Sequence, residues 1–170
     1  MNTFFESGYQ LRRLLPQEWP LLKAIRLEAL RTSIGVFGNS FEFESKFDDS
    51  YWQQRLESDQ NAIWGLFFGE EMIGITGIFT NTEEPSEARL TTSYIRPEHR
   101  GKGLAKRYYE ARIEWARSRG LSKLVVTHRA GNEASRVANQ RAGFRFTHSE
   151  PRVWPDGVAA ENLFYILEIS

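Results

Sequence analysis

Residues 95–107 combine glycine and positive charge in a pattern suited to binding phosphate groups. Gly101 and Gly103 let the backbone approach a ligand closely, and the helix predicted from Gly103 points free N–H groups and its positive dipole end at an anion. Only Glu98 is acidic, whereas five residues are basic: Arg96, Arg100, Lys102, Lys106 and Arg107. Because the whole chain is neutral, with 22 basic and 22 acidic residues, this local excess indicates a polyanion such as a pyrophosphate.

Two common nucleotide-binding motifs do not fit this segment. A P-loop needs the string G-x-x-x-x-G-K-[ST], which the chain does not contain. A dinucleotide-binding fold needs G-x-G-x-x-G, and Lys106 occupies the place of the third glycine. The phosphate ligand is therefore not expected to be held in either of these two ways.

The segment instead resembles the phosphate motif of the GNAT superfamily of acetyl-CoA-dependent N-acetyltransferases, [Q/R]-x-x-G-x-[G/A]. The motif appears here as residues 100–105, Arg-Gly-Lys-Gly-Leu-Ala, after the apolar-x-Pro sequence Ile95–Pro97. A second motif of that superfamily, an Asn followed by a helix and then Gly-Phe, appears as Asn132–Ser135 and Gly143–Phe144. Either motif alone is weak, but the two in this order make the resemblance specific over residues 88–146.

This resemblance implies acetyl-CoA as the co-substrate, without a metal ion. Backbone N–H groups of residues 101–106 would hold the pyrophosphate, while Ile95 and Asn132 would contact the pantetheine arm. The strands that contain Ile95 and Val126 would separate, and the cofactor would fill the gap between them. The predicted cofactor-binding residues are Ile95, Arg100, Gly101, Lys102, Gly103, Leu104, Ala105, Lys106, Asn132 and Asn139.

Several residues are candidates for moving protons in the reaction. Many relatives place a Tyr seven residues after the motif Asn, where it protonates the leaving thiolate, but this chain has Asn139, which cannot supply a proton. In this respect the chain resembles the branch that acetylates ribosomal-protein N-termini. Residues 91–93 offer no carboxylate as a general base, so His128, Tyr94 or a chain of water molecules would do this work.

Hydrophobic periodicity predicts the elements that must position these groups. Spacings of three and four predict helices, with Tyr108 and Trp115 facing the core, and apolar β-rich runs predict strands. Of the four expected helices, one begins at Pro16 and the others cover 48–58, 103–119 and 132–142. Residues 34–47 are expected to form an irregular loop. The expected strands are 9–14, 62–68, 72–79, 88–95, 124–126, 144–152 and 162–168.

Strand, helix, strand over residues 88–126 predicts a parallel pair joined by a right-handed crossover. The expected fold is therefore of the mixed α/β (α+β) class, with a GNAT-like twisted mixed sheet of six to seven strands flanked by about four helices. We expect one domain over residues 1–170, with a flexible N-terminus at 1–8. The acceptor would enter beside the loop Ile34–Asp49 and the turn Trp154–Gly157.

Composition excludes several other classes of protein. The absence of cysteine rules out disulfides, thiolate nucleophiles and cysteine zinc sites, and three scattered histidines argue against a metal site. The first eight residues do not resemble a signal peptide, and no apolar run reaches the length of a membrane span, so a cytoplasmic protein is expected. The neutral net charge argues against a nucleic-acid or membrane partner.

The expected function is transfer of acetyl from acetyl-CoA to a primary amine, carried by a small molecule or by a peptide N-terminus. Because an obvious acid and base are missing, a non-catalytic module that senses acyl-CoA is the alternative. The sequence leaves the oligomeric state open, with a homodimer among the options.

Overall fold

The computed structural model describes residues 3–4 and 6–169. Among these residues, strands form one mixed sheet in the order β1-β2-β3-β4-β5-β6-β8-β7, in which β1 contributes only two residues. The strands are β1 (Thr3–Phe4), β2 (Tyr9–Arg13), β3 (Asn61–Phe68), β4 (Glu71–Thr80), β5 (Glu87–Ile95), β6 (Lys123–Arg129), β7 (Arg145–Val153) and β8 (Ala159–Glu168). The seven predicted strands are confirmed. The predicted flexible N-terminus, 1–8, lies partly outside the described residues.

Four of the helices match the predicted ones. They are α1 (Trp19–Thr32), α3 (Asp49–Glu57), α4 (Leu104–Ser118) and α5 (Glu133–Arg141), with short 3-10 turns at η1 (Glu6–Gly8), η2 (Pro16–Glu18) and η3 (Pro97–His99). The region predicted as an irregular loop contains a further single-turn helix, α2 (Phe41–Glu44), so that prediction was partly wrong. Ser40 begins this turn, because its side chain accepts a hydrogen bond from the Phe43 N–H at 3.2 Å.

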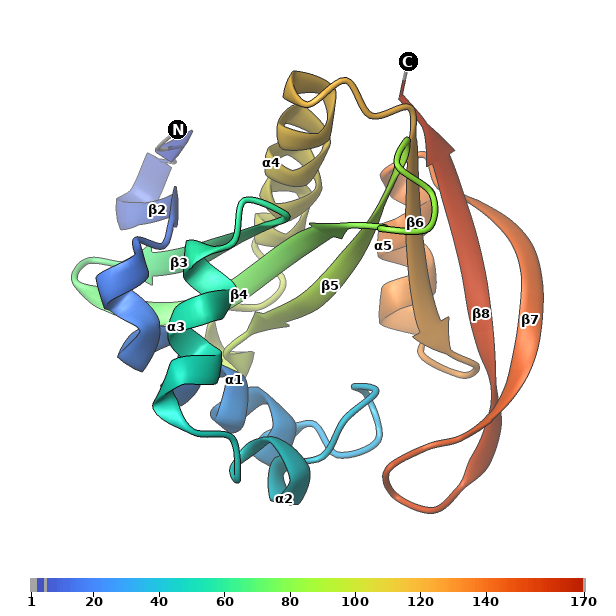
Figure 1. The fold of residues 1–170 in the computed structure, drawn as a ribbon, viewed down its shortest axis with the longest axis horizontal. Helices are drawn as coiled ribbons and strands as arrows, with labels where there is room; N and C mark the ends of the chain where they lie inside the picture. The colour runs from blue at the N-terminus through green and yellow to red at the C-terminus, as the bar shows by residue number, and fades with distance from the viewer. Residues whose placement is uncertain (1–2, 5, 170) are drawn as a thin grey trace.

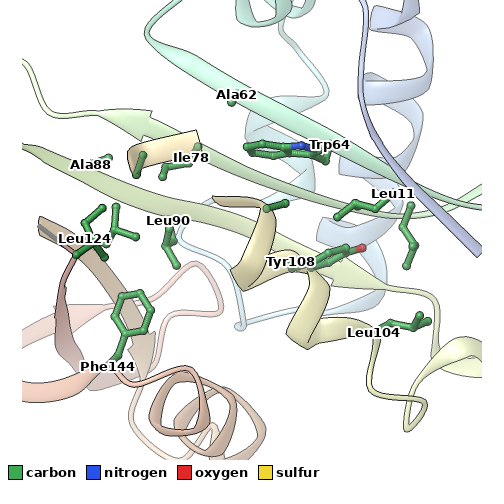
Figure 2. Packing of buried hydrophobic residues seen from close by; sticks show 14 of the residues in the cluster. Leu11, Ala62, Trp64, Ile78, Ala88, Leu90, Leu104, Tyr108, Leu124 and Phe144 are labelled. Carbon is green, nitrogen blue, oxygen red and sulfur yellow. The ribbon is translucent and has the colours of Figure 1, made fainter. Parts of the chain in front are cut away.

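Helices cover both faces of the sheet. Figure 1 shows α1 and α3 on one face of β3 and β4, and α4 on the other. Trp52 of α3 packs with α1 and the sheet on the first face. On the second face, Tyr108 of α4 lies among side chains that include Leu11 and Trp64, as Figure 2 shows. Tyr108 is only 1% exposed, which confirms its predicted place in the core.

The parallel strands β5 and β6 separate along their length. Their pairing is limited to Glu87–Arg89 of β5 and Lys123–Val125 of β6, and beyond it the two strands diverge (Figure 1). An extra residue in β5, Thr92, interrupts the register with β4 and has a φ of 41°. Such a bulge bends its strand. The separation between the strand ends that was expected from the resemblance is therefore present.

The segment between α1 and α2 is bound to residues at the ends of β6 and β7. Arg129 of β6 donates to the Gly35 carbonyl at 3.0 Å and forms an ion pair with Asp156 at 2.7 Å. Arg152 of β7 donates to the Gly38 carbonyl at 2.8 Å. These contacts hold the segment across the open side of the β5–β6 gap. Among the described residues, no helix has the length and hydropathy needed to cross a bilayer.

Candidate functional site

The predicted phosphate-binding segment forms an exposed turn at the start of α4. Gly101 and Gly103 have φ values of 73° and 76°, a backbone conformation that favours glycine. No side chain caps α4 at Gly103, so the first N–H groups of the helix have no partner within it. The side chains of Lys102 and Lys106 are exposed, as is that of Ala105, whereas Leu104 points its side chain into the core (Figure 2).

This turn fits the pyrophosphate of coenzyme A. A Cβ atom added at Gly101 or Gly103 would meet no atom within 4 Å, so the space beside both glycines is open to a ligand. Free main-chain N–H groups at a helix N-terminus, with lysine ammonium groups beside them, are donors suited to phosphate oxygens. Lys106 is not fully available, because it lies 3.9 Å from Glu110 on the same helix.

The residues predicted to contact the pantetheine arm lie on the two sides of the β5–β6 gap. Ile95 ends β5 on one side, and its carbonyl accepts a hydrogen bond from Arg100 Nε at 2.7 Å. Arg100 therefore fastens the end of the strand to the phosphate turn. Asn132 follows β6 and caps α5, since its Oδ1 accepts from the Ser135 N–H at 3.2 Å.

A mainly apolar cavity of about 480 Å³ lies between α4 and α5 and begins at the phosphate turn. Tyr109 lines it and donates a hydrogen bond to Asn139 Oδ1 at 2.5 Å. Asn139 is 1% exposed, and its Nδ2 has no hydrogen-bond partner. The position at which many relatives carry a tyrosine therefore holds a buried amide that a tyrosine of α4 approaches.

Arg112 completes this group of side chains. It is 2% exposed and lies with its guanidinium 4.8 Å from the centre of the Tyr109 ring, and its Nη1 donates to Ser93 of β5 at 3.0 Å. No ion pair joins it to a carboxylate in the described part of the chain, and burial lowers its pKa to about 10. Arg112 lies on the same helix face as Tyr108, which the sequence pattern assigned to the core, and Tyr109 lies beside that face, so a site role was predicted for neither residue.

His128 is buried at the end of β6, its ring stacks on Tyr165 of the cluster that contains Tyr108, and the residue is among those that line a cavity beside the β5–β6 gap. Its Nδ1 lies 2.8 Å from the Arg129 carbonyl, which requires a proton on that nitrogen. Its Nε2 lies 3.2 Å from the Tyr165 hydroxyl, so in the neutral ring this nitrogen accepts. His128 thus lies beside the β5–β6 gap, with both ring nitrogens engaged.

Tyr94, the other predicted base, points in a different direction. Its hydroxyl donates to Glu28 of α1 at 2.9 Å, and the side chain packs in the α1–α3 cluster. Burial raises the pKa of Tyr94, and the hydrogen bond to the Glu28 carboxylate acts in the same direction. The geometry therefore brings His128, but not the Tyr94 hydroxyl, to the cavity beside the gap.

Comparison with known proteins places these features in a family. Residues 19–144 match the acetyltransferase (GNAT) family. The chain is 40% identical over 60 residues to an L-methionine sulfoximine/L-methionine sulfone acetyltransferase of Pseudomonas paraeruginosa, and this stretch covers 35% of either protein. The chain thus matches only about a third of the length of that curated relative.

Two solved structures share the fold over nearly the whole chain. The putative acetyltransferase yncA from Salmonella typhimurium, solved with its cofactor acetyl-CoA, superimposes with a TM-score of 0.80 at 18% identity, over 96% of this chain and 95% of that one. A ribosomal-protein-S5-alanine acetyltransferase from Vibrio fischeri gives a TM-score of 0.81 at 16% identity, over 100% and 97%. Because the family match spans most of the sequence and the fold agrees with it, this chain belongs to the acetyltransferase (GNAT) family.

Proposed function

We propose that this protein transfers the acetyl group of acetyl-CoA to a primary amine. One observation carries the proposal: only the short turn η3 separates the open glycine turn of residues 100–103 from the end of β5, where β5 and β6 separate. A site for phosphate oxygens and an unpaired strand edge are thereby placed next to each other. This arrangement suits a long cofactor that carries a pyrophosphate at one end and amide groups along its arm.

The residues of the chain would divide the binding work as follows. Main-chain N–H groups of residues 101–106 would donate to the pyrophosphate, with the side chains of Arg100, Lys102 and Lys106 beside them. The backbone at Ile95 and the side chain of Asn132 would contact the pantetheine arm. The bound cofactor would supply an acetyl thioester, a reactive carbonyl with a thiolate as its leaving group.

Transfer forms a C–N bond, breaks a C–S bond and moves one proton from the amine, with one proton needed at the thiolate. Asn139 has no proton to give, and we propose that Tyr109 supplies it. Its hydroxyl lies at the Asn139 side chain, and burial raises its pKa while the Arg112 cation acts in the opposite direction. Tyr109 therefore carries a proton at neutral pH that the buried cation makes easier to release.

For removal of the amine proton we favour His128, whose Nε2 would exchange its hydrogen bond from Tyr165 for one from the amine or from a water molecule. His128 lines the cavity beside the β5–β6 gap, whereas the Tyr94 hydroxyl is committed to Glu28. The relatives differ in their acceptors: one is named for L-methionine sulfoximine and L-methionine sulfone, and the other for the alanine of ribosomal protein S5. The names of these relatives thus include both a small molecule and a protein residue as acceptors.

Coenzyme A binding to Gly103→Glu tests the site. The new carboxylate would stand in the phosphate turn, and a like charge against the pyrophosphate should weaken binding by on the order of a hundredfold or more. Isothermal titration with coenzyme A measures this loss. A release of free thiol from acetyl-CoA in the presence of amines would then separate an enzyme from a module that only binds.

Gly120→Glu is the matched control. Gly120 follows the other end of α4, has a φ of 71°, and a Cβ added there meets no atom within 4 Å. The Gly120→Glu substitution therefore introduces the same charge and the same backbone strain away from the proposed site. Unchanged coenzyme A affinity in Gly103→Glu, or an equal loss in Gly120→Glu, would refute the assignment.

A further inference from the structure

Two cavities lie next to each other on the α1 face of the sheet. The first, of about 350 Å³, is called the α3 cavity, and its walls include Asn39, Tyr51, Arg55, Asn61 and Ile63. The second, of about 260 Å³, is called the gap cavity, and its walls include Phe37, Arg89, Val125, Thr127, His128 and Arg152. The cavities share Arg26, Phe79 and the bulged segment of β5 at Thr91 and Thr92. A molecule in the α3 cavity can therefore reach the β5–β6 gap.

The charges around these cavities do not cancel. Four arginines line them, Arg26, Arg55, Arg89 and Arg152, whereas Glu44 is the one carboxylate among their described lining residues. Glu87, outside the lining, pairs with Arg89 at 3.5 Å. Both oxygens of Glu44 are taken by Arg26, with distances of 2.8 and 2.9 Å. Among the described residues, Arg55 and Arg152 form no ion pair with a carboxylate, so the cleft keeps an excess of positive charge in a chain that is neutral as a whole.

Arg55 is the arginine whose surroundings point most clearly to a ligand. It is half-buried at the end of α3 and lies with its guanidinium 5.9 Å from the centre of the Tyr51 ring. Within the described residues, no ion pair links Arg55 to a carboxylate, and Glu44 is already committed to Arg26. Burial lowers the pKa of Arg55. The nearest negative charge is Glu44, which Arg55 shares with Arg26, so two cations have one carboxylate between them. A partly desolvated cation with only a shared counter-charge is costly, and a bound anion would reduce that cost.

We propose that the acceptor is a small primary amine that also carries a carboxylate, and that Arg55 binds this carboxylate in the α3 cavity. The inference rests on the proposed acetyl transfer, because it identifies the acceptor of that reaction. Arg55 can donate two parallel hydrogen bonds to a carboxylate. The volume of the α3 cavity lies within the range of about 300–1,000 Å³ usual for small-molecule sites.

The same charges would also prepare the amine for reaction. Arg89 and Arg152 line the gap cavity, where the amine would lie near Thr91 and Thr92. Positive charge nearby disfavours the ammonium form and lowers the pKa of the amine, so more of it is present as the neutral nucleophile. A cationic acceptor without an anionic group would be repelled from the cleft. A peptide N-terminus lacks the carboxylate next to its amine.

Acetylation of matched acceptors tests this inference. Each of the common amino acids and its C-terminal carboxamide is incubated with acetyl-CoA, and the release of free thiol is measured. At least one amino acid should be acetylated with a kcat/KM about tenfold to a hundredfold above that of its amide, the usual loss when a charge-assisted pair is removed. Equal values for the two forms, or acetylation of peptides and amides alone, would overturn the proposal.

Variants at Arg55 then assign the contact. Arg55→Gln should raise KM for the amino acid about tenfold or more and leave KM for its amide unchanged, while Arg55→Lys should lie in between. Arg31→Gln is the control, because Arg31 is an exposed arginine of α1 that lines neither cavity. An equal KM for the amino acid in wild type and Arg55→Gln would contradict the role of Arg55.

A binding measurement separates this inference from the proposed function. The rise in melting temperature with the same amino acids and amides, recorded with coenzyme A present, needs no turnover. Stabilisation by amino acids that disappears in Arg55→Gln supports the carboxylate site, and stabilisation that persists contradicts it. Absence of thiol release with every amine would instead count against the acetyl transfer itself.

Discussion

In our proposal, Tyr109 of α4 supplies the proton that a tyrosine at position 139 would supply in many relatives. The position seven residues after Asn132 holds Asn139, whose side chain is buried against α4 and receives the Tyr109 hydroxyl. A phenol has a proton to give and a carboxamide does not. Beneath it, the buried Arg112 has no carboxylate partner among the described residues, so its charge acts on Tyr109 with little screening.

We expect Tyr109→Phe to lower kcat about tenfold to a hundredfold, at or below the low end of general-acid effects, because solvent can partly replace the phenol as proton donor. The dissociation constant for coenzyme A should stay within about twofold of the wild-type value, since the ring and its packing remain. Steady-state kinetics and calorimetry together measure the two quantities.

Tyr108→Phe is the comparison for this substitution. Its hydroxyl donates to the Tyr94 carbonyl at 2.9 Å and faces the core, so its removal should cost stability of about 1 kcal/mol without a comparable loss of kcat. A kcat for Tyr109→Phe equal to wild type would exclude the phenol as proton donor. Parallel losses of kcat and of coenzyme A affinity would show that Tyr109 acts only through packing.

At the scale of elements, a buried ion pair fixes α2 beside α1. Arg26 and Glu44 make two hydrogen bonds, and both side chains are less than a tenth exposed. Burial favours the neutral form of Glu44, but the hydrogen bonds and charge of Arg26 outweigh it and lower the pKa of the carboxyl. Because the folded protein binds this proton less readily than the unfolded chain, the pair stabilises above the ordinary carboxyl pKa of 4.5.

This pair should make stability depend on pH. At neutral pH, Glu44→Gln should lower the free energy of unfolding by about 3 kcal/mol, since it leaves the Arg26 charge buried without its partner. As the pH falls below 4.5 toward the folded pKa of Glu44, the wild type loses the contribution and the difference between the two proteins shrinks. Urea unfolding of both proteins across this range measures the difference.

The exposed Glu42 on the same turn gives the control. Glu42→Gln should change the free energy of unfolding by less than about 0.5 kcal/mol at any of these pH values. The account of the ion pair fails if Glu44→Gln is as stable as the wild type at neutral pH. It also fails if the gap between the two proteins does not close in acid.

How far the elements could be predicted depends on the range of the forces that form them. The hairpin of β3 and β4 and the helix α4 carry strong local periodicity, and both were predicted within two residues of their ends. The bulge at Thr92 was not predictable, because it depends on register with β4 and not on residues 91–93 alone. The turn of α2 was missed because four residues are too few to show a helical period; besides its Ser40 cap, it is held by the contact of Glu44 with Arg26, eighteen positions away.

In the candidate site, too, features set by neighbouring residues were predictable and features set by long-range contacts were not. Gly101, Gly103 and Asn132 could be predicted because contiguous motifs contain them, and the structure places them at a helix start and a strand end. Tyr109 and Arg55 could not be predicted, because the roles proposed for them depend on contacts with residues of other helices and of the cavity walls. Arg55 has no motif, and only the absence of a carboxylate partner for it among the described residues makes it stand out.

At the scale of the whole molecule, the β5–β6 gap divides the sheet into two parts. β1 to β5 lie on one side and β6, β8 and β7 on the other, and the two parts are paired directly only through residues 87–89 and 123–125. A cofactor that contacts Ile95 on one side and Asn132 on the other would join them beyond that short pairing. Binding should therefore stabilise the protein as a whole and reduce opening of the strand ends that face the gap.

We expect acetyl-CoA at a hundred times its dissociation constant to raise the free energy of unfolding by about 2.7 kcal/mol. For a chain of this size, that gain corresponds to a rise in melting temperature of roughly 5–10 °C. Amide hydrogen exchange should slow in residues 93–95 and 126–132, which border the gap, and stay unchanged in the turn between β3 and β4. Gly103→Glu should show neither effect. Stabilisation without protection at the gap would mean that the cofactor binds elsewhere, because joining the two halves of the sheet requires contact with both strand ends.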